Sequence, residues 1–114
     1  MKNIFNNFET HFGYSIPKAL EDLYSDKNIT TKIPGTFKFK TVGFVLEIRE
    51  LLDIKNVENY DVENGRLSFA VNSDGFKLLV DLNSKNMEIL QDEFDDIDSI
   101  GVTIQDLLDA EKVN

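Results

Sequence analysis

The fold is decided by the stretch LSFAVNSDGFKLLVD, residues 67–81. Alternate residues of its first part, 67–71, are apolar, which is the period of a β-strand. Asn-Ser-Asp-Gly at 72–75 is a hairpin-turn signal, in which Gly75 supplies a positive φ. The apolar run over 76–82 is typical of a central strand covered on both faces. The stretch therefore predicts two adjacent antiparallel strands.

The chain after this hairpin predicts one more strand and a helix. Asn-Ser-Lys-Asn at 83–86 turns the chain, and residues 87–90 form the third strand. Thr103 resembles an N-cap, and Asp106 stands three residues later, close to the pattern of a capping box. The apolar residues of 104–108 then form the stripe of a final helix. We expect an antiparallel meander that ends in a helix.

Two helices are predicted before the strands. Apolar residues over 4–12 fall at helical spacing, and Gly13 can take the left-handed conformation that ends a helix. Pro17 marks a new start, because proline is tolerated in a first helical turn. Apolar residues over 16–24 continue this second helix, which we expect to end near Asn28.

The segment between the helices and the hairpin is less distinct. After Pro-Gly at 34–35, apolar residues alternate in phase over 37–48, which indicates extended chain. Residues 45–52 also fit a helical pattern, and we expect a short helical turn over 49–53. The polar residues 56–65 indicate a loop.

These elements indicate a single α+β domain over residues 1–114, with a mostly antiparallel sheet, two N-terminal helices and one C-terminal helix. The 114 residues are 41% hydrophobic, far from the composition of a disordered segment. The absence of cysteine excludes a disulfide scaffold, a thiol nucleophile and a cysteine-ligated zinc site. Residues 1–30 contain no apolar stretch of signal-peptide length, and no apolar run is long enough to span a bilayer. We therefore expect a cytoplasmic protein that has no contact with a membrane.

The charge of the chain is concentrated near its C-terminus. The formal net charge is −9 and the pI is near 4.4, which opposes direct binding to nucleic acid. Residues 1–80 carry 10 Lys and Arg against 11 Asp and Glu, whereas residues 81–114 carry 2 against 10. The densest part, 92–98, has five carboxylates in seven residues and no cation.

Two interpretations of this acidic stretch remain open from the sequence. It can be a solvated loop that keeps the protein soluble, or a surface that receives a basic partner. For the second, the candidate contact residues are Glu88, Asp92, Glu93, Asp95, Asp96 and Asp98, with Phe94 and Ile97 as anchors. The alternative for the two apolar side chains is that they fold inward and pin the stretch to the core, which the sequence slightly favours.

The sequence carries no motif of catalysis, of a metal site or of a cofactor site. His11 is the only histidine, and no nucleophile-elbow motif surrounds any serine that could pair with it. Asn72, Asp74 and Gly75 resemble part of a calcium loop. The position six residues after Gly75, where the loop needs a bidentate glutamate, is Asp81, which lies in the apolar strand, so calcium binding is not expected. The carboxylates of 92–98 are weak grounds for a divalent-cation site. The sequence therefore disfavours an enzyme. The catalytic alternative that stays open is a small metal-dependent hydrolase.

The order of several motifs resembles the SUKH superfamily. SIPKALEDLY at 15–24 is similar to its early helix after a proline, and LLD at 51–53 to its short leucine-rich segment. LSFAVNSDG at 67–75 resembles its strand and Gly-Asp-Gly turn, and FKLLVD at 76–81 the strand that follows and ends in Asp. VTIQDLL at 102–108 is similar to its closing helix.

The resemblance implies an α+β domain and a class of function. Many bacterial members are immunity proteins that bind and neutralise a toxin encoded beside them, often a nuclease, and fungal relatives are regulators that act through protein partners. No catalytic residue is carried over. Pro17, Asp74, Gly75 and Asp81 match family positions, and we interpret them as structural.

The charge and the resemblance together lead to a functional hypothesis. A nuclease toxin has a basic cleft for its polyanionic substrate, and an acidic inhibitor can imitate that charge. We expect an immunity protein that binds a basic nuclease toxin through an acidic surface. The alternative is a non-catalytic interaction or regulatory domain without a toxin partner.

Overall fold

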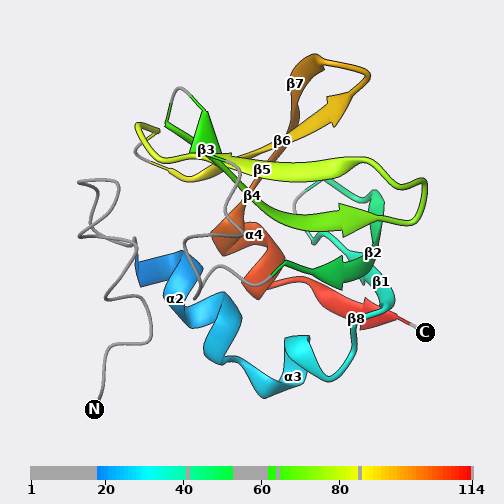
Figure 1. Cartoon of the computed structure of the whole chain (residues 1–114). Coiled ribbons are helices and arrows are strands. Elements are labelled where there is room, and N and C mark those ends of the chain that lie inside the picture. The colour runs from blue at the N-terminus through cyan, green and yellow to red at the C-terminus, as the bar shows by residue number, and fades with distance from the viewer. Residues whose placement is uncertain (1–17, 41, 53–61, 64, 85, 114) are drawn as a thin grey trace.

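The computed structural model describes residues 18–40, 42–52, 62–63, 65–84 and 86–113, and its elements are labelled in Figure 1. Its helices are α2 (Lys18–Ser25), α3 (Lys27–Thr30) and α4 (Ile104–Leu108). Its strands are β1 (Gly35–Lys38), β2 (Val45–Leu51), β3 (Val62–Glu63), β4 (Arg66–Asn72), β5 (Lys77–Asp81), β6 (Glu88–Glu93), β7 (Asp96–Thr103) and β8 (Glu111–Val113). The predicted helix over 4–13, Pro17 and His11 lie outside the described residues.

The strands form one sheet in the order β7-β6-β5-β4-β2-β1-β8, and β3 pairs with the start of β4. Every described pair is antiparallel. The sheet curls around the helices, which lie on its inner side, and the β6–β7 hairpin extends away from α2 and α3 (Figure 1). The prediction of an α+β fold with a mostly antiparallel sheet is confirmed.

The core lies between the inner face of the sheet and the helices. Helix α2 contributes Leu20 and Leu23, and α4 contributes Ile104 and Leu107, all of them fully buried. The two helices pack against each other, because each has its apolar residues on one face. The largest buried side chains of the strands are Phe37, Ile48, Leu67, Phe69 and Leu78, and Phe39, directly after β1, is also fully buried.

The side chain of Tyr24 ties α2 to the sheet. Its hydroxyl lies 2.7 Å from the carbonyl oxygen of Leu52 and 2.8 Å from that of Phe69. The backbone N–H of Leu52 also donates to the Phe69 carbonyl, at 2.8 Å. The tyrosine therefore joins the helix to the point where the chain leaves β2 beside β4. On the exposed side of the helix, the hydrogen bond from Lys18 to Asp22 raises the pKa of Lys18.

The predicted meander is confirmed. Strands β4 and β5 pair on either side of the turn at 72–75, and Gly75 has a φ of 89°. Strand β5 lies between β4 and β6, and Leu78, Leu79 and Val80 are all buried, as expected for the apolar run. The third strand, β6, extends further than expected, to Glu93.

The segment 37–48 differs from a continuous extended chain. It contains β1 and β2, which pair with each other after the chain reverses at residues 39–44. The N–H of Phe39 donates to the carbonyl of Phe44 at 2.9 Å, and Gly43 has a φ of 76°. Phe37 and Leu46 stand opposite each other on the same face. The reversal preserves the apolar phase on both sides of the turn, so alternation alone did not reveal it.

The helical turn expected over 49–53 is wrong for its described residues, because Arg49, Glu50 and Leu51 belong to β2. Glu50 and Leu51 pair with Val71 and Ala70, after an irregularity in the register. Pairing with a long central strand thus overrides a local helical pattern. Most of the loop expected over 56–65 lies outside the described residues.

The capping box at the start of α4 is confirmed. The Oγ1 of Thr103 accepts from the N–H of Asp106 at 3.2 Å, and the Asp106 carboxylate accepts from the N–H of Thr103 at 2.9 Å. Strand β8, which the sequence did not predict, follows the helix and pairs with β1. The Nζ of Lys112 donates to the carbonyl of Ala110 at 2.9 Å, which ties the short strand to the end of the helix.

Candidate functional site

The acidic stretch 92–98 forms the end of the β6–β7 hairpin. Glu93 and Asp96 are the last paired residues, and Phe94 and Asp95 form a two-residue turn. Both turn residues have positive φ, 53° and 70°, as in a type I′ turn. The stretch is therefore an ordered hairpin rather than a loop, and its tip carries a phenylalanine at a position where asparagine or glycine is preferred.

The register divides the carboxylates between the two faces of the hairpin. Directly opposed residues of antiparallel strands share a face. Asp98 stands opposite Gln91, and Asp96 opposite Glu93, so these three carboxylates and the Gln91 amide lie on one face. Asp92 stands opposite Ile97 on the other face.

The carboxylate of Asp92 has a role inside the hairpin. Its Oδ1 accepts a hydrogen bond from the N–H of Asp95 at 2.9 Å, which helps to hold the turn. Asp92 also stands opposite Lys77 of β5 in the register. Asp92 is thus a predicted contact residue whose carboxylate also stabilises the turn of the hairpin.

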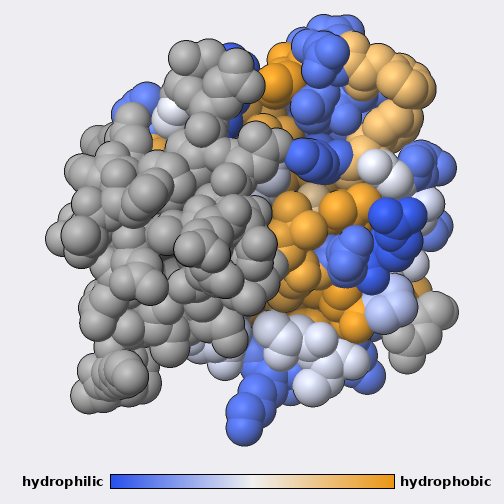
Figure 2. All heavy atoms as spheres, viewed as in Figure 1, coloured by the Kyte–Doolittle hydropathy of each residue, from blue (hydrophilic) through white to orange (hydrophobic). Residues whose placement is uncertain are grey.

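Phe94 does not fold into the core, and the expectation that it pins the stretch inward is wrong. Its side chain is 87% exposed. The ring makes one edge-on contact with Phe76, with centroids 5.4 Å apart. Apolar atoms accordingly lie over the tip of this hairpin beside hydrophilic ones (Figure 2). Phe94 is a turn residue with positive φ, and the conformation of the turn leaves its ring in solvent instead of packed in the core.

The other predicted contact residues are not all at the tip. Ile97 is half-buried on the face of Asp92. Glu88 is exposed but stands opposite Thr103 at the base of the hairpin. At about 3.3 Å per residue, it lies roughly 16 Å along the strand from Glu93. The structure therefore groups residues 92–98 at the end of the hairpin, and Glu88 lies apart from them.

The residues interpreted as structural have defined partners. The Oδ1 of Asn72 accepts from the N–H groups of Asp74 and Phe76, at 3.0 and 2.9 Å. The Oδ1 of Asp81 accepts from the N–H of Asn83 at 2.9 Å, where β5 ends. The Nδ2 of Asn72 donates to the Oε1 of Gln91 at 3.0 Å, so the same side chain joins the β4–β5 turn to β6.

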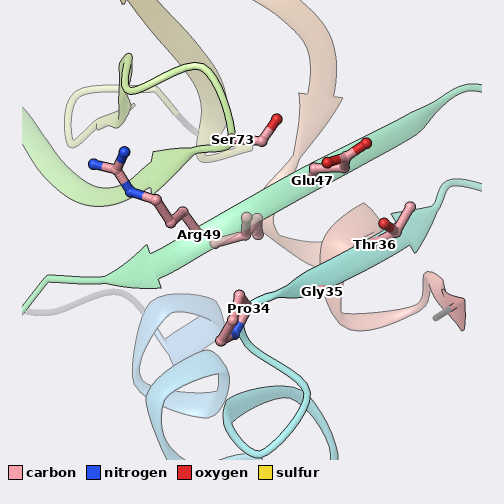
Figure 3. Close-up of a pocket in the computed structure, with 7 residues that line it drawn as sticks. Pro34, Gly35, Thr36, Glu47, Arg49 and Ser73 are labelled. Atoms are coloured by element: carbon pink, nitrogen blue, oxygen red, sulfur yellow. The ribbon is translucent and has the colours of Figure 1, made fainter.

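A shallow pocket of about 290 Å³ opens between β2 and the β4–β5 turn. Glu47 and Arg49 leave β2 and diverge from each other, with Ser73 of the turn between them (Figure 3). The Nη2 of Arg49 lies 3.9 Å from a carboxylate oxygen of Glu50. The N–H of Ser73 donates to the carbonyl of Glu47 at 3.2 Å, which holds the turn against β2.

A second pocket, of about 240 Å³, shares Glu47 and Ser73 with the first. Its remaining lining residues are Val45, Leu46, Asn72, Asp74 and Gln91. It therefore reaches from β2 to β6 beneath the β4–β5 turn. Val45, Glu47 and Gln91 were not candidates from the sequence, because Gln91 is far from the other two along the chain and only the sheet brings them together.

Two further findings concern the described residues. Within them, no three acidic or histidine side chains are grouped so that they could hold a metal ion. No helix in this part of the chain is both long and apolar enough to cross a membrane.

Comparison with known proteins gave no relative: no family model, no curated protein and no solved structure matches the chain.

Proposed function

We propose that this chain is a SUKH-like immunity protein that binds and neutralises a cognate bacterial toxin. The observation that carries the proposal is the β6–β7 hairpin. Its residues 92–98 carry five carboxylates, and an exposed phenylalanine stands at its turn. The proposed toxin is a basic nuclease domain, and the proposed site of action is the cytoplasm.

The charge of the hairpin suits a basic partner. Asp95, Asp96 and Asp98 are exposed, and Glu93 and Asp96 stand opposite each other although both are negative. Opposed like charges destabilise a strand pair. A basic cleft would neutralise them on binding, and the field of the hairpin would raise the association rate by roughly 10–10³-fold. Fast association is what a toxin antidote requires.

Affinity requires an anchor besides charge. Exposed ion pairs contribute only about 0.2–1 kcal/mol each, whereas a buried aromatic side chain can dominate an interface. Phe94 is the most exposed large apolar side chain in the described part of the protein. A positive φ costs a residue other than glycine about 1 kcal/mol or more. The hairpin thus holds an aromatic ring in solvent at an energetic cost, which favours a role in recognition.

The fold agrees with what the SUKH resemblance implies. The resemblance expects an α+β domain whose turn and strand over 72–81 lie inside an antiparallel sheet, and β4, the turn and β5 occupy that position. Gly75 has the positive φ expected of the family turn, and Asp81 caps the strand end. These observations support the proposal at the level of fold.

Co-expression with the product of the neighbouring toxin gene tests the proposal. We expect the wild-type chain to abolish toxicity and to co-purify with the toxin domain at equimolar ratio. Toxicity that persists although both proteins are folded and expressed would overturn the proposal, and would leave an interaction domain without a toxin partner.

A further inference from the structure

Three turns lie at the same end of the sheet. The chain runs toward this end in β1, β4 and β6 and away from it in β2, β5 and β7, because all the pairs are antiparallel. The β1–β2 turn (described residues 39–40 and 42–44), the β4–β5 turn (72–76) and the β6–β7 turn (94–95) therefore share one end. We call these residues, together with Val45, Glu47 and Gln91, the three-turn surface.

Exposed apolar side chains gather on the three-turn surface. Among the described residues, five large apolar side chains are exposed, and four of them belong to it. Three come from the β1–β2 turn and the start of β2, namely Val42, Phe44 and Val45, and the fourth is Phe94. The ring of Phe44 also packs on the buried Phe39, with centroids 5.1 Å apart, so this apolar tip is held in place.

The pocket of about 240 Å³ lies between the two apolar tips. Val45 and Gln91 come from its two flanking strands, β2 and β6, and Glu47 and Asp74 are the acidic residues of its lining. None of its described lining residues is a cation, and Arg49 belongs to the neighbouring pocket on the other side of Ser73.

The face of Gln91 extends the negative charge beyond the pocket. Asp98 stands opposite Gln91, and Glu93 and Asp96 share that face. A cationic group in the pocket would lie beside the two acidic residues of its lining, Glu47 and Asp74.

We infer that the three-turn surface binds an extended segment of a basic protein partner, with an arginine side chain of that segment in the pocket beside Glu47 and Asp74. Arginine suits this site because its planar guanidinium donates several hydrogen bonds to carboxylates at once. Apolar neighbours of the arginine would contact Val45 on one side and Phe94 on the other. The inference rests on the proposed function and adds a second contact region, remote in sequence from the acidic stretch.

The pocket can be tested without any partner protein. The probe is N-acetyl-arginine amide, titrated into the full ¹⁵N-labelled chain, with the uncharged isostere N-acetyl-citrulline amide as its control. The side-chain amide signals of Asn72 and Gln91 report on the pocket directly. We expect saturable shifts of these signals and of the Ser73 and Asp74 amides with the arginine derivative only.

A matched pair of variants assigns the binding to the pocket carboxylates. Glu47→Gln with Asp74→Asn should weaken the probe by about fivefold to tenfold, because each exposed ion pair contributes up to about 1 kcal/mol. Glu21→Gln with Asp109→Asn makes the same change of net charge on the helices and should leave the affinity unchanged. Equal shifts with citrulline, equal weakening in both variants, or shifts confined to 92–98 would overturn the inference.

The outcome is separable from that of the proposed function. Toxin neutralisation by a chain whose pocket does not bind the probe would sink the inference and leave the proposed function intact. If the pocket binds the probe but the chain does not protect against the toxin, the proposed function is overturned and arginine binding in the pocket stands.

Discussion

The ring of Phe94 lies edge-on to the ring of Phe76, with their centroids 5.4 Å apart. Phe76 is the last residue of the β4–β5 turn, directly before β5, so the contact joins two neighbouring turns of the sheet. It is the interaction that steadies an otherwise exposed aromatic side chain at the tip of the acidic hairpin. A ring that is held but not buried is available to a partner without a cost in core packing.

Replacement of Phe94 by asparagine separates recognition from folding. Asparagine accepts a positive φ more readily than phenylalanine, which offsets the lost ring contact of about 0.5–1.5 kcal/mol. We expect Phe94→Asn to leave the free energy of unfolding within about 1 kcal/mol of wild type. The affinity for the toxin should fall by at least about 30-fold, as for an anchor residue. Denaturant unfolding and calorimetric titration measure the two effects, and an unchanged affinity would remove Phe94 from the interface.

Neutralisation of Asp95, Asp96 and Asp98 by asparagine should slow association with the toxin by about tenfold at low salt. The salt dependence of the rate should become flatter, because fewer charges steer the encounter. Asp92 is left intact because its carboxylate holds the turn. Stopped-flow measurement of the triple variant makes the test, with Glu21, Asp109 and Glu111 neutralised as the matched control. Equal slowing in the control would assign the effect to net charge alone.

The opposed carboxylates of Glu93 and Asp96 predict a gain of stability on charge reversal. Asp96→Lys turns a repulsive cross-strand pair into an attractive one, and we expect the free energy of unfolding to rise by about 0.5 kcal/mol. The same variant should bind the toxin more weakly. Asp109→Lys, which changes the net charge equally at the end of α4, controls for general electrostatics. A stability loss in Asp96→Lys would show that the two carboxylates do not repel in the folded state.

Removal of the Tyr24 hydroxyl tests the link between α2 and the sheet. Tyr24→Phe keeps the ring and removes the single O–H donor that the carbonyl groups of Leu52 and Phe69 share, although the Phe69 carbonyl still accepts from the N–H of Leu52. We expect a loss of about 1–2 kcal/mol in the free energy of unfolding, with toxin binding unchanged at temperatures where the variant is folded. Wild-type stability in thermal and urea unfolding would contradict the assigned hydrogen bonds.

The capping box of α4 makes a graded prediction. Thr103→Ala removes the acceptor for the N–H of Asp106 and should cost about 1 kcal/mol of stability. Thr103→Ser keeps the hydroxyl and should cost less than half as much. If both variants lose the same stability, the methyl group of threonine is what matters, and the capping interaction is not.

Sequence reasoning succeeded where local chemistry and the global fold agree. The turn at 72–75 has the residues that a hairpin requires, and the apolar run after it has no alternative to a central strand. The Thr103 cap is likewise local, because its partner stands three residues away. Such elements follow from neighbours in the chain.

Some of the elements that were missed depend on partners far along the chain, and others follow turns that lack the usual turn residues. The helical pattern at 49–51 yields to pairing with β4, and β8 is only three residues long. The β1–β2 turn carries apolar Val42 and Phe44 in place of turn residues, and the β6–β7 turn has neither asparagine nor glycine. The sequence shows that the carboxylates of 92–98 are clustered. Which of them share a face of the hairpin follows only from the strand register in the structure.

Strand β7 ends the strand order, so in the described part of the protein its outer edge pairs with no other strand. An open edge invites a second copy of the same chain to add to the sheet. Asp96 and Asp98 make that approach repulsive, and the register shift near Gly101, with its φ of 85°, interrupts the straight edge. A second copy of the chain would bring the same carboxylates to this edge and be repelled by them, whereas a strand of opposite charge would be attracted to it.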